Sequence, residues 1–156
     1  MSQKLGIEVV AASSAEAAVR GAHVINVITK SAEPVLKGAW LERGQHVNAA
    51  GSNALSRREL DDEAVKKSDV IAVDSRDTAS RECGDLLPSV EKGWRHWDSL
   101  TEMGEIIANR ARGRSSPGEI TLYESHGMGI QDLWVGARML ALARERGVGV
   151  ELPIGN

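Results

Sequence analysis

The fold is decided by the run from Asp69 to Ser75, which reads DVIAVDS. Its centre is continuously apolar and its ends are polar, which is typical of a parallel strand buried on both faces. Other runs are about a strand long, and most of them are also apolar on both faces: Val24 to Thr29 (VINVIT), His46 to Gly51 (HVNAAG), Glu119 to Ser125 (EITLYES) and, more weakly, Leu5 to Val10 (LGIEVV). Helical patterns separate these runs, so the sequence predicts strand-helix-strand units and an α/β fold with a parallel sheet flanked by helices.

The segments with helical periodicity are residues 14–20, 57–67, 76–84, 100–110 and 130–146. Three of them follow a serine that has a glutamate three residues later, which is the spacing of a capping box: Ser13 with Glu16, Ser56 with Glu59, and Ser99 with Glu102. The last and longest helix carries a wide apolar stripe, which we expect to pack against a large surface. Its members are Ile130, Leu133, Trp134, Ala137, Leu140 and Ala141.

Composition and charge exclude several classes of function. With 156 residues, of which 42% are hydrophobic and 26% charged, the chain can bury a sizeable core. The formal net charge of −3 argues against general nucleic-acid binding, and we interpret the arginine-rich stretch Arg110 to Arg114 as a solvated loop. No segment approaches the ~18 uninterrupted apolar residues of a membrane span, and no signal peptide is indicated.

The metal and redox chemistry expected from the sequence is limited. The single cysteine, Cys83, excludes an internal disulfide and a zinc site built from several cysteines, and it fits a reducing, cytoplasmic setting. No cluster of His, Asp and Glu has metal-ligand spacing, so the sequence predicts no metal site. We interpret His23, His46 and His96 as packing or surface residues.

Polar residues follow the predicted strands at the edge where open α/β sheets bind ligands. Thr29 ends one strand, and the loop Gly51 to Glu59 (GSNALSRRE) leads from the next strand toward a helix. This loop is either an anion-binding wall, with Asn53 as donor and acceptor, or a turn with solvated arginines, and the spacing favours neither. Asp74 either holds a ribose or ends its strand, and we favour the second interpretation.

The segment Gly127-Met128-Gly129 connects a predicted strand to the long helix. It resembles the start of a dinucleotide-binding glycine motif, but Asp132 stands where the third glycine would be. An acidic residue in the first helical turn repels a pyrophosphate, so we interpret the segment as a tight turn rather than a phosphate site. The turn nevertheless places Ser125 and His126 at the ligand-binding edge of the sheet.

Three stretches together resemble the C-terminal half of the ornithine cyclodeaminase/mu-crystallin family. They are VINVITKSAEPVLKGAWLERGQHVNAAGSNALSRRELDDE (24–63), DVIAVDSRDTASRECGDLL (69–87) and EITLYESHGMGIQDL (119–133), with MGEIIANRARGRSSP between the last two. The resemblance implies a Rossmann-like domain over residues 1–126, followed by a C-terminal helix and tail over residues 127–156. In the family, this last segment returns toward a dimerisation domain. The first βαβ unit, which carries the glycine fingerprint, is expected to be missing from this sequence.

The same resemblance implies roles for individual residues. Thr29 and Ser125 correspond to cofactor contacts, and His126 to a position next to the substrate. The loop lining the nicotinamide corresponds to Ala50, Gly51, Ser52, Asn53 and Arg57. Asn53 stands where the true ornithine cyclodeaminases carry a catalytic aspartate, and an amide cannot act as a carboxylate base.

The parent chemistry implied by the resemblance is hydride transfer between NAD or NADP and an amino acid or cyclic imine. The reaction types are those of a cyclodeaminase, a ketimine reductase and an amino-acid dehydrogenase, in a homo-oligomer. The alternative is a non-catalytic remnant that binds no cofactor and acts as a binding or self-assembly module. Without its first unit, such a chain would expose a sheet edge and apolar surface.

Overall fold

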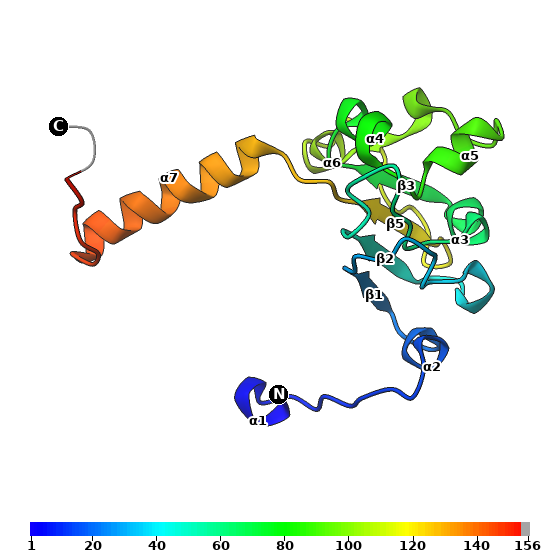
Figure 1. Ribbon diagram of the computed structural model, residues 1–156, viewed down its shortest axis with the longest axis horizontal. Coiled ribbons are helices and arrows are strands. Elements are labelled where there is room, and N and C mark those ends of the chain that lie inside the picture. Colours follow the sequence, from blue (N-terminus) through cyan, green and yellow to red (C-terminus); the bar gives the residue numbers. More distant parts are fainter. Residues whose placement is uncertain (154–156) are drawn as a thin grey trace. The chain divides into compact units, whose positions relative to one another are not determined.

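The computed structural model describes residues 1–153, which divide into two compact units, one from Met1 to His126 and one beginning at Gly127. The first unit is built on a five-stranded sheet in the order β1-β2-β5-β3-β4, with every neighbouring pair parallel (Figure 1). The strands are β1 (Val24–Val27), β2 (His46–Ala49), β3 (Val70–Val73), β4 (Thr101–Glu102) and β5 (Thr121–Glu124). The predicted α/β fold with a parallel sheet is therefore confirmed.

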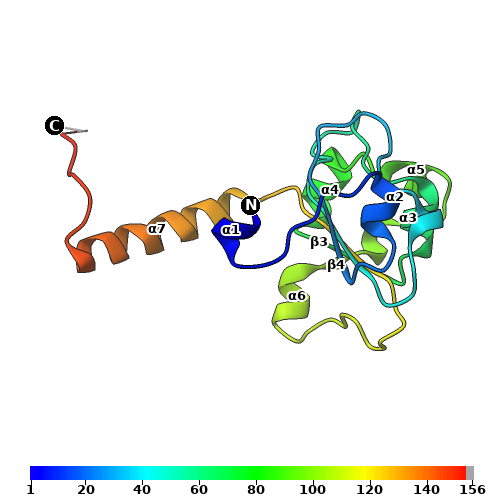
Figure 2. The same ribbon diagram turned by 90° about the horizontal axis from the view of Figure 1, so that it is seen from below.

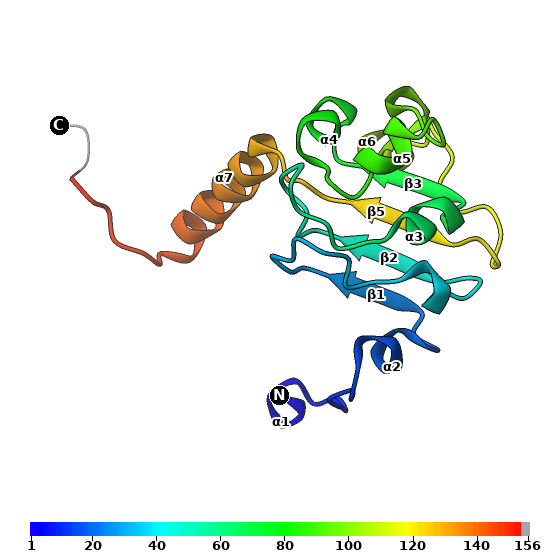
Figure 3. The same cartoon turned by 45° about the vertical axis from the view of Figure 1, so that its right-hand side comes forward.

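The strand order determines which chain segments meet at the carboxyl edge of the sheet. Val27 of β1, Ala49 of β2, Glu124 of β5 and Val73 of β3 lie side by side in register. Because the strands are parallel, the residues that follow all four emerge at the same edge, as the arrowheads in Figure 3 show. Open α/β sheets bind their ligands at this edge.

The first unit contains short helices, which precede or connect its strands. They are α1 (Ser2–Leu5), α2 (Ala15–Val19), α3 (Asp62–Lys67), α4 (Arg76–Glu82), α5 (Leu87–Glu91) and α6 (Met103–Ile107), with 3-10 turns at Gly38–Trp40 and Trp97–Ser99. Figure 2 shows α6 on the opposite side of the sheet from α3 and α5. The largest fully buried side chains include Leu36, Leu60, Leu86 and Leu122. The core is therefore aliphatic, as a chain without phenylalanine requires.

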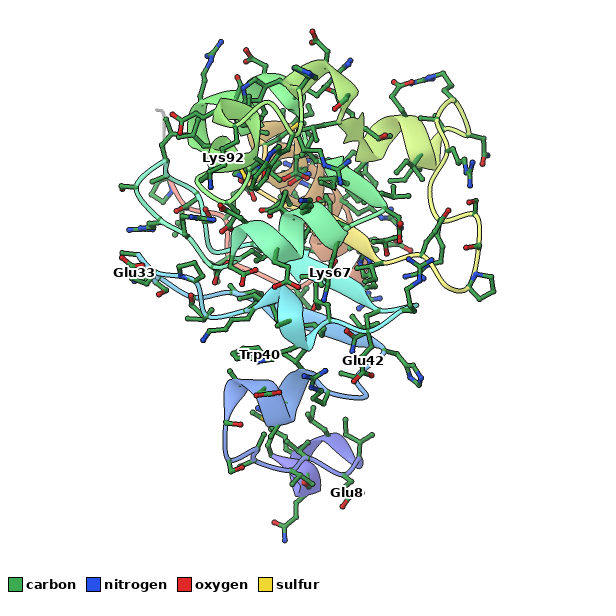
Figure 4. All side chains as sticks on the ribbon, turned by 90° about the vertical axis from the view of Figure 1, so that its right-hand side faces the viewer. Glu8, Glu33, Trp40, Glu42, Lys67 and Lys92 are labelled. Carbon is green, nitrogen blue, oxygen red and sulfur yellow. The ribbon has the colours of Figure 1, made fainter. Side chains whose placement is uncertain are left out.

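Helix α3 approaches the turn at Gly38–Trp40 closely. A Cβ atom at Gly38 would lie 2.3 Å from the backbone nitrogen of Ala64, so only glycine fits. The Lys67 ammonium donates a hydrogen bond to the Gly38 carbonyl at 2.8 Å. Figure 4 labels Lys67 and Trp40 on this side of the molecule.

The predicted helix over 57–67 begins only at Asp62, because Asp61 caps it by accepting a hydrogen bond from the Ala64 N–H at 2.8 Å. The prediction of a capping box at Ser56 and Glu59 is therefore wrong. The box at Ser13 is also wrong, because Ser14 caps α2.

The segments at 100–110 and 5–10 also differ from the expectation. Residues 101–102 form strand β4, which pairs with β3, and within the predicted helix only Met103–Ile107 is helical. The Ser99 hydroxyl does not cap this helix but donates a hydrogen bond to the His96 carbonyl. The segment Leu5 to Val10 forms no strand, because it pairs with no other strand among the described residues; Val9 instead hydrogen-bonds to the Ser2 hydroxyl.

The second unit consists mainly of α7 (Gly129–Arg146), which ends at Gly147 in a left-handed conformation with φ of 63°. This agrees with the predicted helix over 130–146. No residue of α7 is buried, so the predicted apolar stripe is exposed: Ile130, Leu133, Trp134 and Leu140 are each at least half accessible. Within residues 1–153, no helix is long and apolar enough to cross a membrane.

Candidate functional site

The candidate site lies where β1, β2, β5 and β3 end. The Ala50 N–H donates to the Val27 carbonyl, and the Ser125 N–H donates to the Ala49 carbonyl, each at 2.9 Å. The first residues beyond the strands are thus still fixed to their neighbours. The topology brings the predicted site residues, which are up to about a hundred positions apart in the sequence, to one edge.

Five of the predicted cofactor-contact residues line one pocket at this edge, with a volume of about 240 Å³. They are Thr29, Ala50, Gly51, Asn53 and Arg57, and Ile28 and Lys30 complete the lining. Ser52 and Ser125 do not line this pocket. The arrangement combines backbone from two strand ends with the cationic side chains of Lys30 and Arg57.

A buried carboxylate holds two walls of the pocket together. Glu59 is fully buried, and its carboxylate accepts a hydrogen bond from the Gly51 N–H at 2.7 Å and another from the Thr29 N–H. A Cβ atom at Gly51 would lie 2.2 Å from the Thr29 carbonyl oxygen, so this approach of the two loops requires glycine. Glu59, predicted as part of a helix cap, instead joins the ends of β1 and β2.

The loop between Ser52 and Arg57 is closed by its own hydrogen bonds. The Arg57 guanidinium donates to the Asn53 side-chain oxygen at 2.9 Å, and the Ser52 hydroxyl donates to the Arg57 carbonyl at 2.8 Å. Ser52 is buried whereas Asn53 is exposed. Asn53 and Arg57 therefore present a paired amide and guanidinium at the pocket, and Ser52 supports the loop behind them.

Asp74 organises the end of β5. Its buried carboxylate accepts hydrogen bonds from the Ser125 hydroxyl at 2.9 Å, from the His126 N–H at 2.8 Å and from the Tyr123 hydroxyl. Burial, reinforced by Asp74, raises the pKa of Tyr123. Asp74 ends its strand as predicted and in addition fixes Ser125 and His126.

His126 is half-buried, and burial lowers the pKa of its imidazole against the opposing influence of Asp74 and Glu82. The neutral imidazole is therefore favoured near neutral pH. In this form, one ring nitrogen donates and the other accepts a hydrogen bond. His126 can thus bind a polar group without adding a positive charge.

A group of buried polar residues behind the site had no signal in the sequence: Cys83, Asp85 and Glu124, together with Glu59. Asp85 accepts hydrogen bonds from the Glu59 and Leu60 N–H groups at 2.7 and 2.8 Å, and burial raises its pKa to about 6. Burial, followed by the charge of Asp85, raises the pKa of Glu124 well above its ordinary value. Burial likewise raises the pKa of Cys83.

Comparison with known proteins gives consistent relatives. The chain is 39% identical over 121 residues to the ketimine reductase mu-crystallin of Mus musculus, covering 78% of this chain and 36% of that protein. Among solved structures, the Thermococcus litoralis Δ1-pyrroline-2-carboxylate reductase in complex with NADH and L-proline has a TM-score of 0.90 and 36% identity, covering 97% of this chain and 47% of that one. An archaeal alanine dehydrogenase dimer with bound NAD has a TM-score of 0.86 and 33% identity, covering 99% and 47%.

The chain spans less than half the length of each of these relatives. Residues 1–145 match the ornithine cyclodeaminase/mu-crystallin family, which is nearly the whole described chain. The solved relatives bind NADH or NAD, which agrees with the cofactor class that the resemblance implied. By its sequence and its fold, the chain belongs to the ornithine cyclodeaminase/mu-crystallin family.

Proposed function

We propose that this chain forms the nicotinamide side of an NAD(H) or NADP(H) site and contributes to hydride transfer between that cofactor and an amino acid or cyclic imine. The observation that carries the proposal is the convergence of Thr29, Ala50, Gly51, Asn53 and Arg57 on one pocket at the carboxyl edge of a parallel sheet. The family relationship supports it, because relatives include a ketimine reductase and a pyrroline-2-carboxylate reductase.

The pocket fits one end of a dinucleotide. Its volume of about 240 Å³ is below the roughly 300–1,000 Å³ of sites that enclose drug-sized ligands. A nicotinamide ring with its ribose is therefore a better match than a whole dinucleotide. Lys30 and Arg57 favour a neighbouring anionic group, such as a cofactor phosphate or a substrate carboxylate.

The residues present favour imine reduction or amino-acid oxidation over ornithine cyclisation. When bound, the cofactor supplies or accepts the hydride. Asn53 orients a polar group through its amide but cannot take up a proton as a carboxylate does. His126, held by Asp74 through its backbone, is proposed to contact the substrate as a neutral hydrogen-bonding group. Ser125 is proposed to contact the cofactor while its hydroxyl is oriented by Asp74.

Calorimetric titration of the purified chain with NADH and with NADPH tests this proposal. We expect Arg57→Gln to weaken binding by roughly 10- to 100-fold, the equivalent of one charge-assisted hydrogen bond. Arg43→Gln is the matched control, because Arg43 is 69% exposed and its ion pair within residues 1–153 is with Asp69. If neither nucleotide gives heat or raises the melting temperature of the folded chain, the cofactor proposal is wrong for this chain.

The second candidate function is a non-catalytic binding or self-assembly module, and two exposed features favour it. Strand β1 lies at the edge of the sheet, with its first residue, Val24, 54% exposed. On α7, Leu133 is 67% and Trp134 68% exposed. Both surfaces suit association with a second copy of the chain. Light scattering that shows a monomer at high protein concentration would argue against this function.

We further propose a cytoplasmic location and no nucleic-acid or membrane partner. A single buried and unpaired cysteine and a net charge of −3 support these proposals.

A further inference from the structure

Three potential metal ligands that are dispersed in the sequence meet behind the end of β5. Cys83 ends α4 and is fully buried, Glu124 is the last residue of β5 and is 1% exposed, and His126 follows two residues later. The thiol sulfur, a carboxylate oxygen and an imidazole nitrogen all lie within 4.8 Å of one another. The Cys83 sulfur lies 3.7 Å from Glu124 Oε2.

The polar atoms of this cluster are largely unsatisfied. Glu124 Oε1 and both ring nitrogens of His126 are buried and have no hydrogen-bond partner among the described residues. A buried polar atom without a partner destabilises a fold by about 1–3 kcal/mol. Three such atoms on neighbouring side chains indicate that the cluster is completed by something that it binds.

We propose that Cys83, Glu124 and His126 form a binding site for one divalent cation of the Zn²⁺ type. Sulfur, nitrogen and oxygen donors together suit zinc and its neighbours, whereas Mg²⁺ and Ca²⁺ take oxygen ligands. Three protein ligands leave a fourth tetrahedral position for water or another small ligand, as in catalytic rather than structural zinc sites.

The charge balance permits a cation in this buried place. Binding replaces the proton of the Cys83 thiol and the proton of the Glu124 carboxyl, so one M²⁺ enters, two H⁺ leave and the net charge is unchanged. The imidazole of His126 binds as the neutral ring. Asp85, whose negative charge acts on both Cys83 and Glu124, adds favourable electrostatic potential for a cation.

The cluster needs only a small contraction to coordinate zinc. Bonds of about 2.0–2.3 Å in a tetrahedron place ligand atoms roughly 3.3–3.8 Å apart. The largest separation of 4.8 Å must therefore close by about 1 Å. His126 is half-buried and lies beyond the strand, so its side chain can make this adjustment. None of the three ligands lines the proposed cofactor pocket. His126 is the one ligand shared with the proposed function, so the substrate contact proposed for its free ring belongs to the cation-free chain.

Cobalt is the probe for this site, because a thiolate bound to Co²⁺ gives a near-ultraviolet charge-transfer band. Since Cys83 is the only cysteine, such a band in the untagged, chelator-treated chain can come only from this residue. We expect saturation at one Co²⁺ per chain, displacement by Zn²⁺ and loss of the band in Cys83→Ser. His126→Gln and Glu124→Gln should each weaken binding by at least about tenfold, the loss that even outer-shell changes produce.

The control is His96→Gln, because His96 is exposed and distant from the three ligands in the sequence, and it should bind Co²⁺ like the parent chain. Folding of each variant is checked by circular dichroism. If Cys83→Ser does not fold, the half-buried His126→Gln decides the question. The proposal is wrong if the folded parent chain gives no charge-transfer band with Co²⁺, or if His126→Gln binds Co²⁺ as tightly as the parent.

Discussion

Replacing Glu59 by glutamine should destabilise the first unit, because this carboxylate joins the ends of β1 and β2. It accepts hydrogen bonds from the N–H groups of Thr29 and Gly51, and Glu59 is fully buried. Glutamine keeps the shape but has one acceptor oxygen, so its amide group faces the other N–H. One charge-assisted hydrogen bond is lost, about 1.5–3 kcal/mol, and one partly buried N–H loses its partner, which adds about 1 kcal/mol.

Part of this loss is offset. Burial is the main cause of the raised pKa of Asp85 and of Glu124, and the charge of Glu59 adds to it, so removing that charge relieves some repulsion. We therefore expect a net destabilisation of about 3 kcal/mol. With about 1–3 kcal/mol per molar urea for a small domain, the unfolding midpoint should fall by roughly 1–3 M. Tryptophan fluorescence reports the transition, because Trp40 and Trp97 pack against the core.

Glu63→Gln is the matched control, because Glu63 is 50% exposed on α3 and forms a surface ion pair with Lys67. It should change stability by less than about 1 kcal/mol. Glu59→Gln should also weaken nucleotide binding, since Thr29 and Gly51 line the pocket. An unfolding midpoint for Glu59→Gln equal to that of Glu63→Gln would refute the role assigned to this carboxylate.

Gly84→Ala should destabilise the chain by about 1–3 kcal/mol, because the new Cβ would lie 2.0 Å from the carbonyl oxygen of Arg57. In the control, Gly104→Ala, the new Cβ meets nothing within 4 Å, so the melting temperature should stay the same or rise. Asp85→Asn should stabilise the metal-free chain near pH 8 by up to about 3 kcal/mol. Burial raises the pKa of Asp85 in the folded chain from 3.8 to about 6. Hydrogen bonds from the backbone N–H groups of Leu60 and Glu59 oppose this shift, and the side-chain charge of Glu59 adds to it. The protonated form of Asp85 therefore contributes stability that is complete below pH 3.8 and is lost as the pH rises through about 6. In urea unfolding across this pH range, the free energy of unfolding should decline less with rising pH in Asp85→Asn than in the parent chain.

The sequence predicted the sheet well because parallel strands carry their signal locally. The runs containing β1, β2, β3 and β5 are rich in apolar residues, and each contains the observed strand. Only β3 is apolar at every position, whereas β1 and β2 alternate buried residues with more exposed ones. The two-residue β4 is too short to produce such a pattern. Convergence of the site residues was predictable for a related reason, since all segments following parallel strands emerge at one edge.

Helix starts were predicted less well, because a capping pattern competes with distant partners. The serine and glutamate at 56 and 59 have the spacing of a capping box, yet Glu59 bonds to residues that follow two different strands. Those contacts span up to 30 positions in the sequence. Asp61 then supplies the cap two residues later. Local spacing cannot distinguish these outcomes, because the tertiary partners determine which one has the lower free energy.

The buried acidic residues explain why the site lay partly beyond prediction. Glu124 occupies the inward-facing end of an apolar strand, where the sequence pattern calls for a hydrophobic residue, and Asp85 follows a glycine in a loop. Burying carboxyl groups is unfavourable unless hydrogen bonds or a cation compensate. Both oxygens of Glu59 are compensated by Thr29 and Gly51, and Asp85 Oδ1 by backbone N–H groups. Asp85 Oδ2 and Glu124 Oε1 have no hydrogen-bond partner within residues 1–153. Glu124 lies next to Cys83 and His126, so its uncompensated oxygen belongs to the cluster where the cation site is proposed.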